Sequence, residues 1–387
     1  MNRDNRLAEP KGEAVRKPPR YRAVAEALRR QVADGQLAAG VRLPALHELA
    51  EQFKVSTHTI RCAIRLLERE GCTYRVPAVG AFVRPEGAGS TARQTAVALV
   101  TYDIGGAFEL GIARGIEQAC RDRGWELQVY DSRSDPQAEV RSVERLCRNN
   151  GGVRGAIIMP AGREENIESL FRLKLAGVPI VLLDRAIMGL RVDLVESDHE
   201  QGAYRAAKHL LDQGHSHVYM VTEPPVVSSI VSRIRGYQTA HRERNIDPKP
   251  EWMIWVDLEM SLRGVREEHR WLGGYHATLP ALRDLKPPVA FFAMNDYIAW
   301  GLCKACQEVG LRVPQDVSVV CFDDSDITRA MSPPLTVVAQ RTGDLGQKAV
   351  EMLERRVQAA GADFKPELVR VDVELIERQS VARLCEQ

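Results

Sequence analysis

The chain has 387 residues, of which 44% are hydrophobic and 27% charged, so it has the composition of a globular protein long enough for two or three domains. It contains no run of about 18 apolar residues that could cross a bilayer, and its polar N-terminus lacks the apolar segment of a secretory signal, so we expect a cytoplasmic protein. The formal net charge is only +1, but residues 1–85 hold 16 Lys and Arg against 9 Asp and Glu, which favours contact of this end with a polyanion.

The N-terminal part of the chain predicts a small helical domain. Residues 1–19 are rich in charge, proline and glycine, and we expect them to be disordered. Apolar residues at helical spacing predict three helices, over residues 21–34, 45–53 and 57–70. Ser56 is placed to cap the third helix, whose apolar side carries Ile60, Ala63, Ile64 and Leu67. Gly35 and Gly71 are expected to end the first and third helices.

A hairpin is expected after the third helix. The segment is CTYRVPAVGAFV, and it alternates enough to form two strands that turn around residues 78–80. Three helices and a hairpin predict a winged helix-turn-helix domain over residues 20–84. Such a domain lays its third helix in the major groove of DNA, where the polar face would meet bases and phosphates. That face carries Thr57, His58, Arg61 and Arg65. Periodicity alone leaves open that it is only a solvated face.

Three segments of this domain stand in a characteristic order and spacing. They are DGQLAAGVRLP, VSTHTIRCAIRLLEREG and VGAFV. Together they resemble the turn, recognition helix and wing of the GntR regulators' DNA-binding domain, over residues 21–83. The resemblance implies contacts to double-stranded DNA from Ser56, Thr57, Thr59, Arg61 and Gly80.

The chain departs from this family where polar or basic residues are common. Ala45, Leu46 and His47 stand where the family commonly has Ser-Glu-Arg, Thr57 stands in place of an arginine, and Val79 in place of a basic residue. Phosphate contacts carry much of the affinity for DNA, so we expect an unusual or weaker operator.

A second domain is expected after a small polar linker at residues 85–95. Runs rich in Val and Ile, such as TAVALVTY and WELQVYD, alternate with helical patterns such as FELGIARGIEQACRDRG. The alternation predicts an α/β domain over residues 96–380, with parallel sheets flanked by helices.

Several sequence segments of this α/β region carry a second resemblance. They include AGVPIVLLDR, SDHEQGAYRAAKHLLDQGHSHV, AFFAMNDYIAWGL and GLRVPQDVSVVCFDDSD. They resemble the effector domain of the LacI/GalR repressors, a two-lobed fold shared with periplasmic sugar-binding proteins. A GntR-type head with a LacI-type body resembles the arabinose-repressor type of regulator.

The second resemblance implies an effector site in the crevice between two lobes. The polar positions that match the family's ligand contacts are Asp184, Arg185, Arg233, Asp296 and Gln340. Carboxylates accept hydrogen bonds from hydroxyl groups and guanidinium groups donate to them, so this set suits a neutral polyol.

One part of the expected effector site departs from the family. Phe108 matches a position where an aromatic ring stacks on the sugar, but Glu109 stands where the family has another aromatic residue, and Gly106 where it has Asn. The site thus loses a stacking surface and gains an acid. A neutral sugar is favoured over an amine, a purine or another cationic ligand.

Other potential sites are set aside. His209, His215 and His217 lie at a helix end and a strand start, so no metal is expected there. Cys303 and Cys306 have thioredoxin-like spacing but fall within a helix, and the eight cysteines are expected to be thiols. Residues 322–326, FDDSD, are interpreted as a turn in which Asp is common.

The sequence therefore predicts a ligand-responsive regulator that represses carbohydrate-use genes as a homodimer on a two-fold symmetric operator. No cofactor is expected. An enzyme is disfavoured because no GxSxG, Walker-type or GxGxxG motif follows a strand. A DNA-binding dimer whose body has lost its sugar ligand is a further alternative, and the retained polar positions argue against it.

Overall fold

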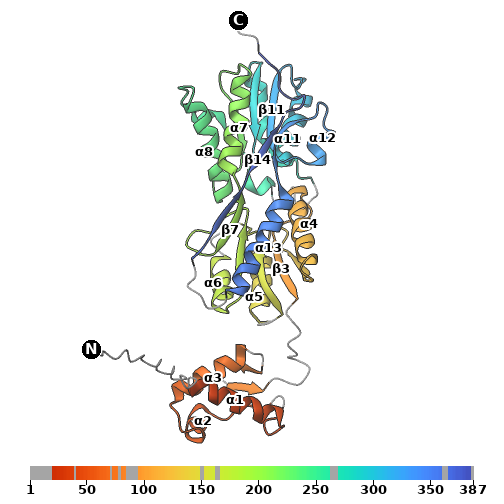
Figure 1. The fold of residues 1–387 in the computed structure, drawn as a ribbon. Coiled ribbons are helices and arrows are strands. Elements are labelled where there is room, and N and C mark those ends of the chain that lie inside the picture. Colours follow the sequence, from red (N-terminus) through yellow and green to blue (C-terminus); the bar gives the residue numbers. More distant parts are fainter. Residues whose placement is uncertain are drawn as a thin grey trace, which may run out of the picture. The chain divides into compact units, whose positions relative to one another are not determined.

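The computed structural model describes residues 20–38, 41–69, 72–76, 80–83, 95–148, 152–161, 166–261, 269–359 and 365–384. The chain divides into two compact units, residues 1–93 and 94–387 (Figure 1). The predicted tail, and all but the last residue of the predicted linker, lie outside the described residues. No helix in the described ranges is both long and apolar enough to span a membrane.

The first unit is a winged helix-turn-helix domain, as predicted. Its elements are α1 (Arg20–Ala33), α2 (Leu46–Gln52), α3 (Thr57–Arg69), β1 (Thr73–Val76) and β2 (Gly80–Val83). The helices share one core, whose buried members include Val24, Leu28, Leu49, Ile60 and Leu67. β1 and β2 pair antiparallel. The predicted stop at Gly71 and the turn residues 77–79 lie outside the described residues.

A third extended segment adds to this wing. Val83 N–H donates to Val41 O at 2.8 Å and Leu43 N–H donates to Ala81 O at 2.7 Å, so residues 41–43 run beside β2. The sequence analysis assigned these residues to a turn. The pairing places Arg42 on the wing sheet, opposite Phe82.

The second unit has two lobes of the same architecture, which confirms the predicted α/β class. The first lobe has a sheet in the order β13-β7-β6-β5-β3-β4, and all its pairs are parallel. Its strands are β3 (Ala96–Thr101), β4 (Glu126–Asp131), β5 (Val153–Ile158), β6 (Ile180–Leu183), β7 (Asp193–Ser197) and β13 (Leu368–Val371). Its helices are α4 (Ala107–Arg121), α5 (Pro136–Arg148), α6 (Ile167–Leu175) and α13 (Thr342–Gln358).

The second lobe repeats this strand order as β14-β12-β11-β10-β8-β9. Its strands are β8 (Tyr219–Thr222), β9 (Met253–Trp255), β10 (Val289–Ala293), β11 (Val317–Phe322), β12 (Thr336–Gln340) and β14 (Val373–Ile376). Its helices are α7 (His199–Asp212), α8 (Ser228–Arg242), η2 (Pro250–Trp252), α10 (Leu272–Asp284), α11 (Asp296–Glu308) and α12 (Asp326–Ala330). The edge strand β14 is antiparallel to β12, whereas the sequence predicted parallel strands throughout.

Each sheet is covered by helices on both faces. In the first lobe, α4 and α13 bury Ile112, Ile116 and Leu345 against one face, and α5 and α6 bury Val143 and Leu170 against the other. The chain passes between the lobes three times, after β7, after β12 and after β13 (Figure 1). Because both sheets are parallel apart from the edge strand β14, the carboxyl ends of the parallel strands define where a ligand can bind.

Candidate functional site

The predicted recognition helix is capped and packed as its sequence indicates. Ser56 Oγ accepts a hydrogen bond from Thr59 N–H at 3.2 Å, which satisfies one of the free donors at the start of α3. Ile60, Ala63, Ile64 and Leu67 are buried, and this side of α3 faces the domain core. The opposite face is therefore available for a partner.

The predicted DNA contacts lie mainly on that outer face. Ser56, Thr57, His58, Arg61 and Arg65 are exposed, Thr59 is half-buried, and Gly80 is the first residue of β2. Arg61 and Arg65 also line a groove of about 240 Å³ with Arg42 and the start of α2. Arg42 was missed in the sequence analysis because its place beside the wing depends on strand pairing. It adds a third cation to a surface of the kind that binds phosphates.

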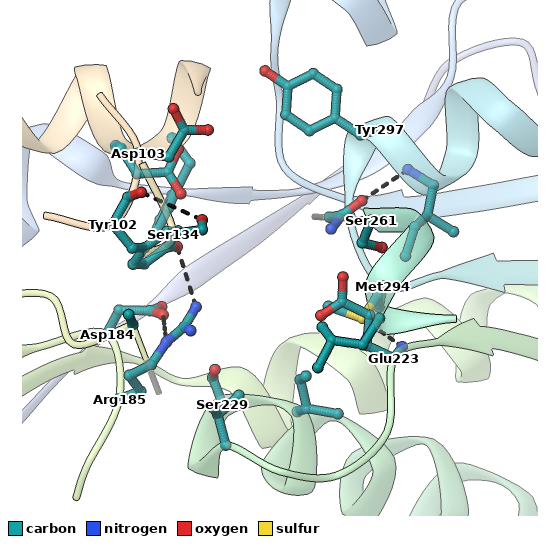
Figure 2. Close-up of a pocket in the computed structure, with 18 of the residues that line it drawn as sticks. Tyr102, Asp103, Ser134, Asp184, Arg185, Glu223, Ser229, Ser261, Met294 and Tyr297 are labelled. Atoms are coloured by element: carbon teal, nitrogen blue, oxygen red, sulfur yellow. Dashed lines mark hydrogen bonds and ion pairs between the residues drawn. The ribbon is translucent and has the colours of Figure 1, made fainter. Parts of the chain in front are cut away.

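The second unit contains a cavity of about 630 Å³ between its lobes. Residues from both lobes line it, and many of them follow the carboxyl ends of strands. All six predicted effector residues are among them: Phe108, Asp184, Arg185, Arg233, Asp296 and Gln340. Figure 2 shows Tyr102, Asp103, Asp184 and Arg185 on one side, facing Glu223, Met294 and Tyr297 on the other.

Two aspartates occupy equivalent positions in the two lobes. Asp184 follows β6 and Asp323 follows β11, and both have left-handed backbones, with φ of 71° and 77°. Asp184 N–H donates to Val195 O and Asp323 N–H donates to Val338 O, each at 2.9 Å on the neighbouring strand. Asp tolerates this conformation better than most residues. Asp323 is a cavity residue that the sequence analysis treated only as part of a turn.

Asp184 is held in its ionised form by the groups around it. Arg185 Nε lies 3.2 Å from Asp184 Oδ2, and His199 Nε2 lies 3.3 Å from Oδ1. Burial alone would raise the pKa of Asp184, but the hydrogen bond from His199 and the charges of Arg185 and Arg233 outweigh it and hold that pKa well below its usual range. Arg185 also donates to Tyr102 Oη at 3.1 Å and stacks over that ring.

Arg233 is buried on α8 and held on three sides. Its guanidinium lies 3.9 Å above the ring of Phe322, and Nη1 donates to Met294 O at 2.5 Å. Nε and Nη2 lie 3.4 and 3.3 Å from His199 Nδ1. Gly236 lets α8 lie close to α7, because a Cβ at position 236 would lie 1.9 Å from Glu200 O on α7.

The remaining polar side of the cavity is acidic. Asp296 begins α11 behind Asn295, whose side chain accepts from Ile298 N–H at 2.8 Å. Gln340 Nε2 donates to Asp323 Oδ1 at 2.5 Å. Burial raises the pKa of Asp323 to about 6, although Arg233 opposes the rise. Burial likewise raises the pKa values of Asp296 and Glu223.

Phe108 and Glu109 lie in the first turn of α4, at the other wall of the cavity. Phe108 packs on the first lobe's core while lining the cavity. Glu109 is 8% exposed, and burial raises its pKa to about 8 despite a hydrogen bond with Tyr102. Next to them, Arg270 forms a two-point ion pair with Asp103. Tyr102, Glu223 and Arg270 were missed in the sequence analysis. Tyr102 and Glu223 directly follow β3 and β8 but belong to no recognisable motif, and Arg270 lies in the loop before α10.

The histidines and cysteines set aside earlier have separate environments. His215 hydrogen-bonds Ser318, His217 stacks on Trp252, and His209 lies 3.7 Å from Glu377. Cys303 and Cys306 both lie on α11 as free thiols.

Comparisons with known proteins agree with both parts of this description. Residues 20–83 match the family of bacterial regulatory proteins named gntR, and residues 207–381 match the periplasmic binding protein-like domain. The chain is 27% identical to the arabinose metabolism transcriptional repressor of Geobacillus stearothermophilus, over 91% of this chain and 96% of that protein. It is also 27% identical to the HTH-type transcriptional repressor PurR of Aliivibrio fischeri, over 71% and 77% of the two chains.

A solved structure extends the comparison to a ligand complex. It is a LacI family transcriptional regulator from Enterococcus faecium with bound ribose, 26% identical, with a TM-score of 0.62 over 75% of this chain and all of that one. These named relatives are transcriptional regulators, which confirms the prediction of a regulator rather than an enzyme.

Proposed function

Because the chain is a transcriptional regulator that joins a GntR-type DNA-binding head to a LacI-like, periplasmic-binding-protein-like body, we propose that it represses transcription by binding operator DNA as a homodimer. A small sugar-like effector in the interlobe cavity alters this binding. The proposed site of action is the cytoplasm, where such DNA is found.

The observation that carries the proposal is the convergence of six predicted residues on one cavity. Phe108, Asp184 and Arg185 come from the first lobe, and Arg233, Asp296 and Gln340 come from the second lobe. A ligand that touches both groups binds the closed lobe arrangement better than the open one. Such a difference in affinity is what allows a ligand to shift a conformational equilibrium.

The DNA side of the proposal rests on α3. Its exposed face offers Thr57, His58, Arg61 and Arg65, and Ser56 and Thr59 lie at its start. We propose that Arg61 contacts a base edge and that Arg65 and Arg42 contact phosphates, with Gly80 letting the wing approach the backbone. A homodimer would read two half-sites related by two-fold symmetry.

The test separates the effector site from the DNA site. An operator is selected from random DNA, and ligands are screened by thermal shift over pentoses, hexoses, polyols, and their amines and acids. We expect Arg233→Ala and Asp296→Asn to weaken binding of the best ligand by at least about tenfold, because their buried partners lose hydrogen bonds. Operator affinity without ligand should stay within about twofold.

The matched control is Arg235→Ala, an exposed arginine on the same helix as Arg233. It should change neither affinity. Equal ligand affinities in the wild type and both cavity variants would show that the effector binds elsewhere. A protein that binds its operator but none of the ligands would favour the alternative of a DNA-binding dimer without an effector.

A further inference from the structure

The lining of the cavity carries far more acid than base among the described residues. Its acidic members are Asp103, Glu109, Asp135, Asp184, Glu223, Glu259, Asp296 and Asp323. Its basic members are Arg185, Arg233 and Arg270. Residues 162–165 and 262–268, which adjoin lining residues in sequence and are not described, hold as many or more acids than bases. They therefore supply no excess of positive charge.

The three arginines are already engaged within the protein. Arg185 pairs with Asp184, and Arg270 pairs with Asp103. Arg233 is enclosed by Phe322, Met294 O and His199. Their positive charges therefore interact with groups of the protein itself, and they neutralise only part of the negative charge of the cavity lining.

Four lining carboxyls form no ion pair within the described part of the chain. They are Glu109 from the first lobe and Glu223, Asp296 and Asp323 from the second. All four are largely buried in the cavity wall, where an ionised carboxylate without a cation is costly. Among the described residues, no group of three or more acids, histidines or cysteines is arranged to hold a metal ion.

The carboxyl group of Glu109 lies in space that Gly106 leaves free. A Cβ at position 106 would lie 1.9 Å from Glu109 Oε2, so the carboxyl occupies the space that any side chain at 106 would enter. Gly106 and Glu109 are the two positions where this chain departs from the sugar-binding pattern. The structure brings these two positions together, since the Glu109 carboxyl lies where a side chain at 106 would be.

We propose that the effector is a sugar- or polyol-sized molecule with a protonated amine, and that Glu109 is the carboxylate that binds this amine. The inference rests on the proposed function and narrows its ligand. An ammonium group between Glu109 and the acids of the second lobe would offset their mutual repulsion across the cavity. Binding of the cation would therefore favour closure of the lobes.

The electrostatics of Glu109 support this assignment. Burial and the nearby charges of Asp103 and Asp323 raise its pKa to about 8, so the carboxyl is costly to ionise without a partner. A cation within about 4–6 Å favours the charged form and lowers such a pKa. A neutral sugar offers no such cation and would leave the pKa of Glu109 raised.

The experiment compares matched pairs of ligands on the full chain. Each amino sugar or amino polyol is tested by calorimetry beside its hydroxyl counterpart, for example glucosamine with glucose and galactosamine with galactose. We expect the amine of the best pair to bind at least about tenfold tighter than its counterpart, as for a charge-assisted hydrogen bond in a buried site. Glu109→Gln should remove this preference.

Two further variants test the role of position. Gly106→Ala keeps the acid but places a methyl group where Glu109 Oε2 lies, and it should also reduce the preference for the amine. Glu117→Gln is the control, since Glu117 is a half-exposed residue on the same helix that pairs with Arg121 outside the cavity. Melting curves of each variant show that it is folded.

Each outcome has a distinct meaning. A hydroxyl compound that binds as tightly as its amine, or an amine preference that survives Glu109→Gln, overturns the inference but leaves the proposed regulator intact. If neither member of any pair and no other compound in the screen binds, the result counts against the proposed sugar-like effector itself.

Discussion

Asp103 and Arg270 form a two-point ion pair that joins the two lobes at the cavity, with Arg270 Nη2 3.1 Å from Asp103 Oδ1. Asp103 follows β3 in the first lobe, and Arg270 precedes α10 in the second. Both side chains are largely buried, and the arginine also lies 5.4 Å from the ring of Tyr297. The contact exists only when the lobes are close together, so it favours the closed arrangement.

The first prediction concerns this pair. Arg270→Ala or Asp103→Asn should shift the ligand-free protein toward the open arrangement and weaken effector binding by about 1–3 kcal/mol, the range for hydrogen bonds to charged groups. Small-angle X-ray scattering of the full chain should show a larger radius of gyration for either variant than for the wild type. The double variant should lose little more than either single variant. Additive losses would show that the two side chains act independently.

The second prediction concerns the recognition helix. Arg61→Ala should weaken operator binding by about 1–3 kcal/mol if the guanidinium contacts a base, and it should relax specificity at one position of each half-site. Arg42→Ala and Arg65→Ala should instead weaken binding to all sequences and make the salt dependence shallower. Fluorescence anisotropy at several salt concentrations measures both effects. Arg133→Ala, an exposed arginine of the effector unit, is the control. Unchanged operator affinity in Arg61→Ala would exclude this residue as a contact.

Motif residues could be predicted from the sequence because their chemistry is local. Ser56 caps α3 through a bond to a residue three positions away, and Ile60, Ile64 and Leu67 have the spacing of one helix face. Asp184 and Arg185 end a strand-like run, and parallel sheets place such ends at the crevice. Their position near the crevice follows from this rule, and their role as ligand contacts was implied by the resemblance to the LacI/GalR repressors.

The rest of the site depends on contacts between distant segments. Arg270 reaches the cavity from a loop in the second lobe to pair with Asp103, 167 positions away in the chain. Arg42 joins the wing through strand pairing that no local pattern marks, and Asp323 has the composition of an ordinary turn. The relation of Gly106 to Glu109 is also visible only in the structure, since it depends on how the carboxyl folds back.

The third prediction concerns His199, which lies between Asp184 and Arg233. A guanidinium only donates hydrogen bonds, so Nδ1 of His199 accepts from Arg233, and Nε2 carries the proton and lies 3.2 Å from Asp184 O. His199→Ala removes the acceptor for Arg233 and the donor to Asp184. It should lower the stability of the effector unit by about 1–3 kcal/mol. It should also weaken effector binding, because Arg233 and Asp184 lose their fixed positions. His276→Ala, an exposed histidine on α10, is the control. Equal melting temperatures for the two variants would contradict this role.

The last prediction concerns pH and Glu109. Its pKa is about 8 in the folded protein against an ordinary value near 4.5, so the folded state binds more protons than the unfolded state between these pH values. Stability therefore falls as pH rises through this range, and it is greatest on the acidic side. The ionisable groups that interact with it are Tyr102, Asp103, Arg185, Arg270, Tyr297 and Asp323.

Substitution isolates the contribution of Glu109 from those of its neighbours. Asp323, whose pKa is raised to about 6, adds a decline of the same sign that ends at lower pH, and it is present in both proteins compared. The ligand-free wild type should therefore lose stability relative to Glu109→Gln between pH 5.5 and 8, by on the order of a few kcal/mol at about 1.4 kcal/mol per pKa unit. Thermal unfolding in buffers of constant ionic strength measures the difference. With a bound amine the carboxylate has its cation, so the same difference should shrink. Parallel pH profiles for the two ligand-free proteins would mean that Glu109 ionises without cost and is not the buried acid described above.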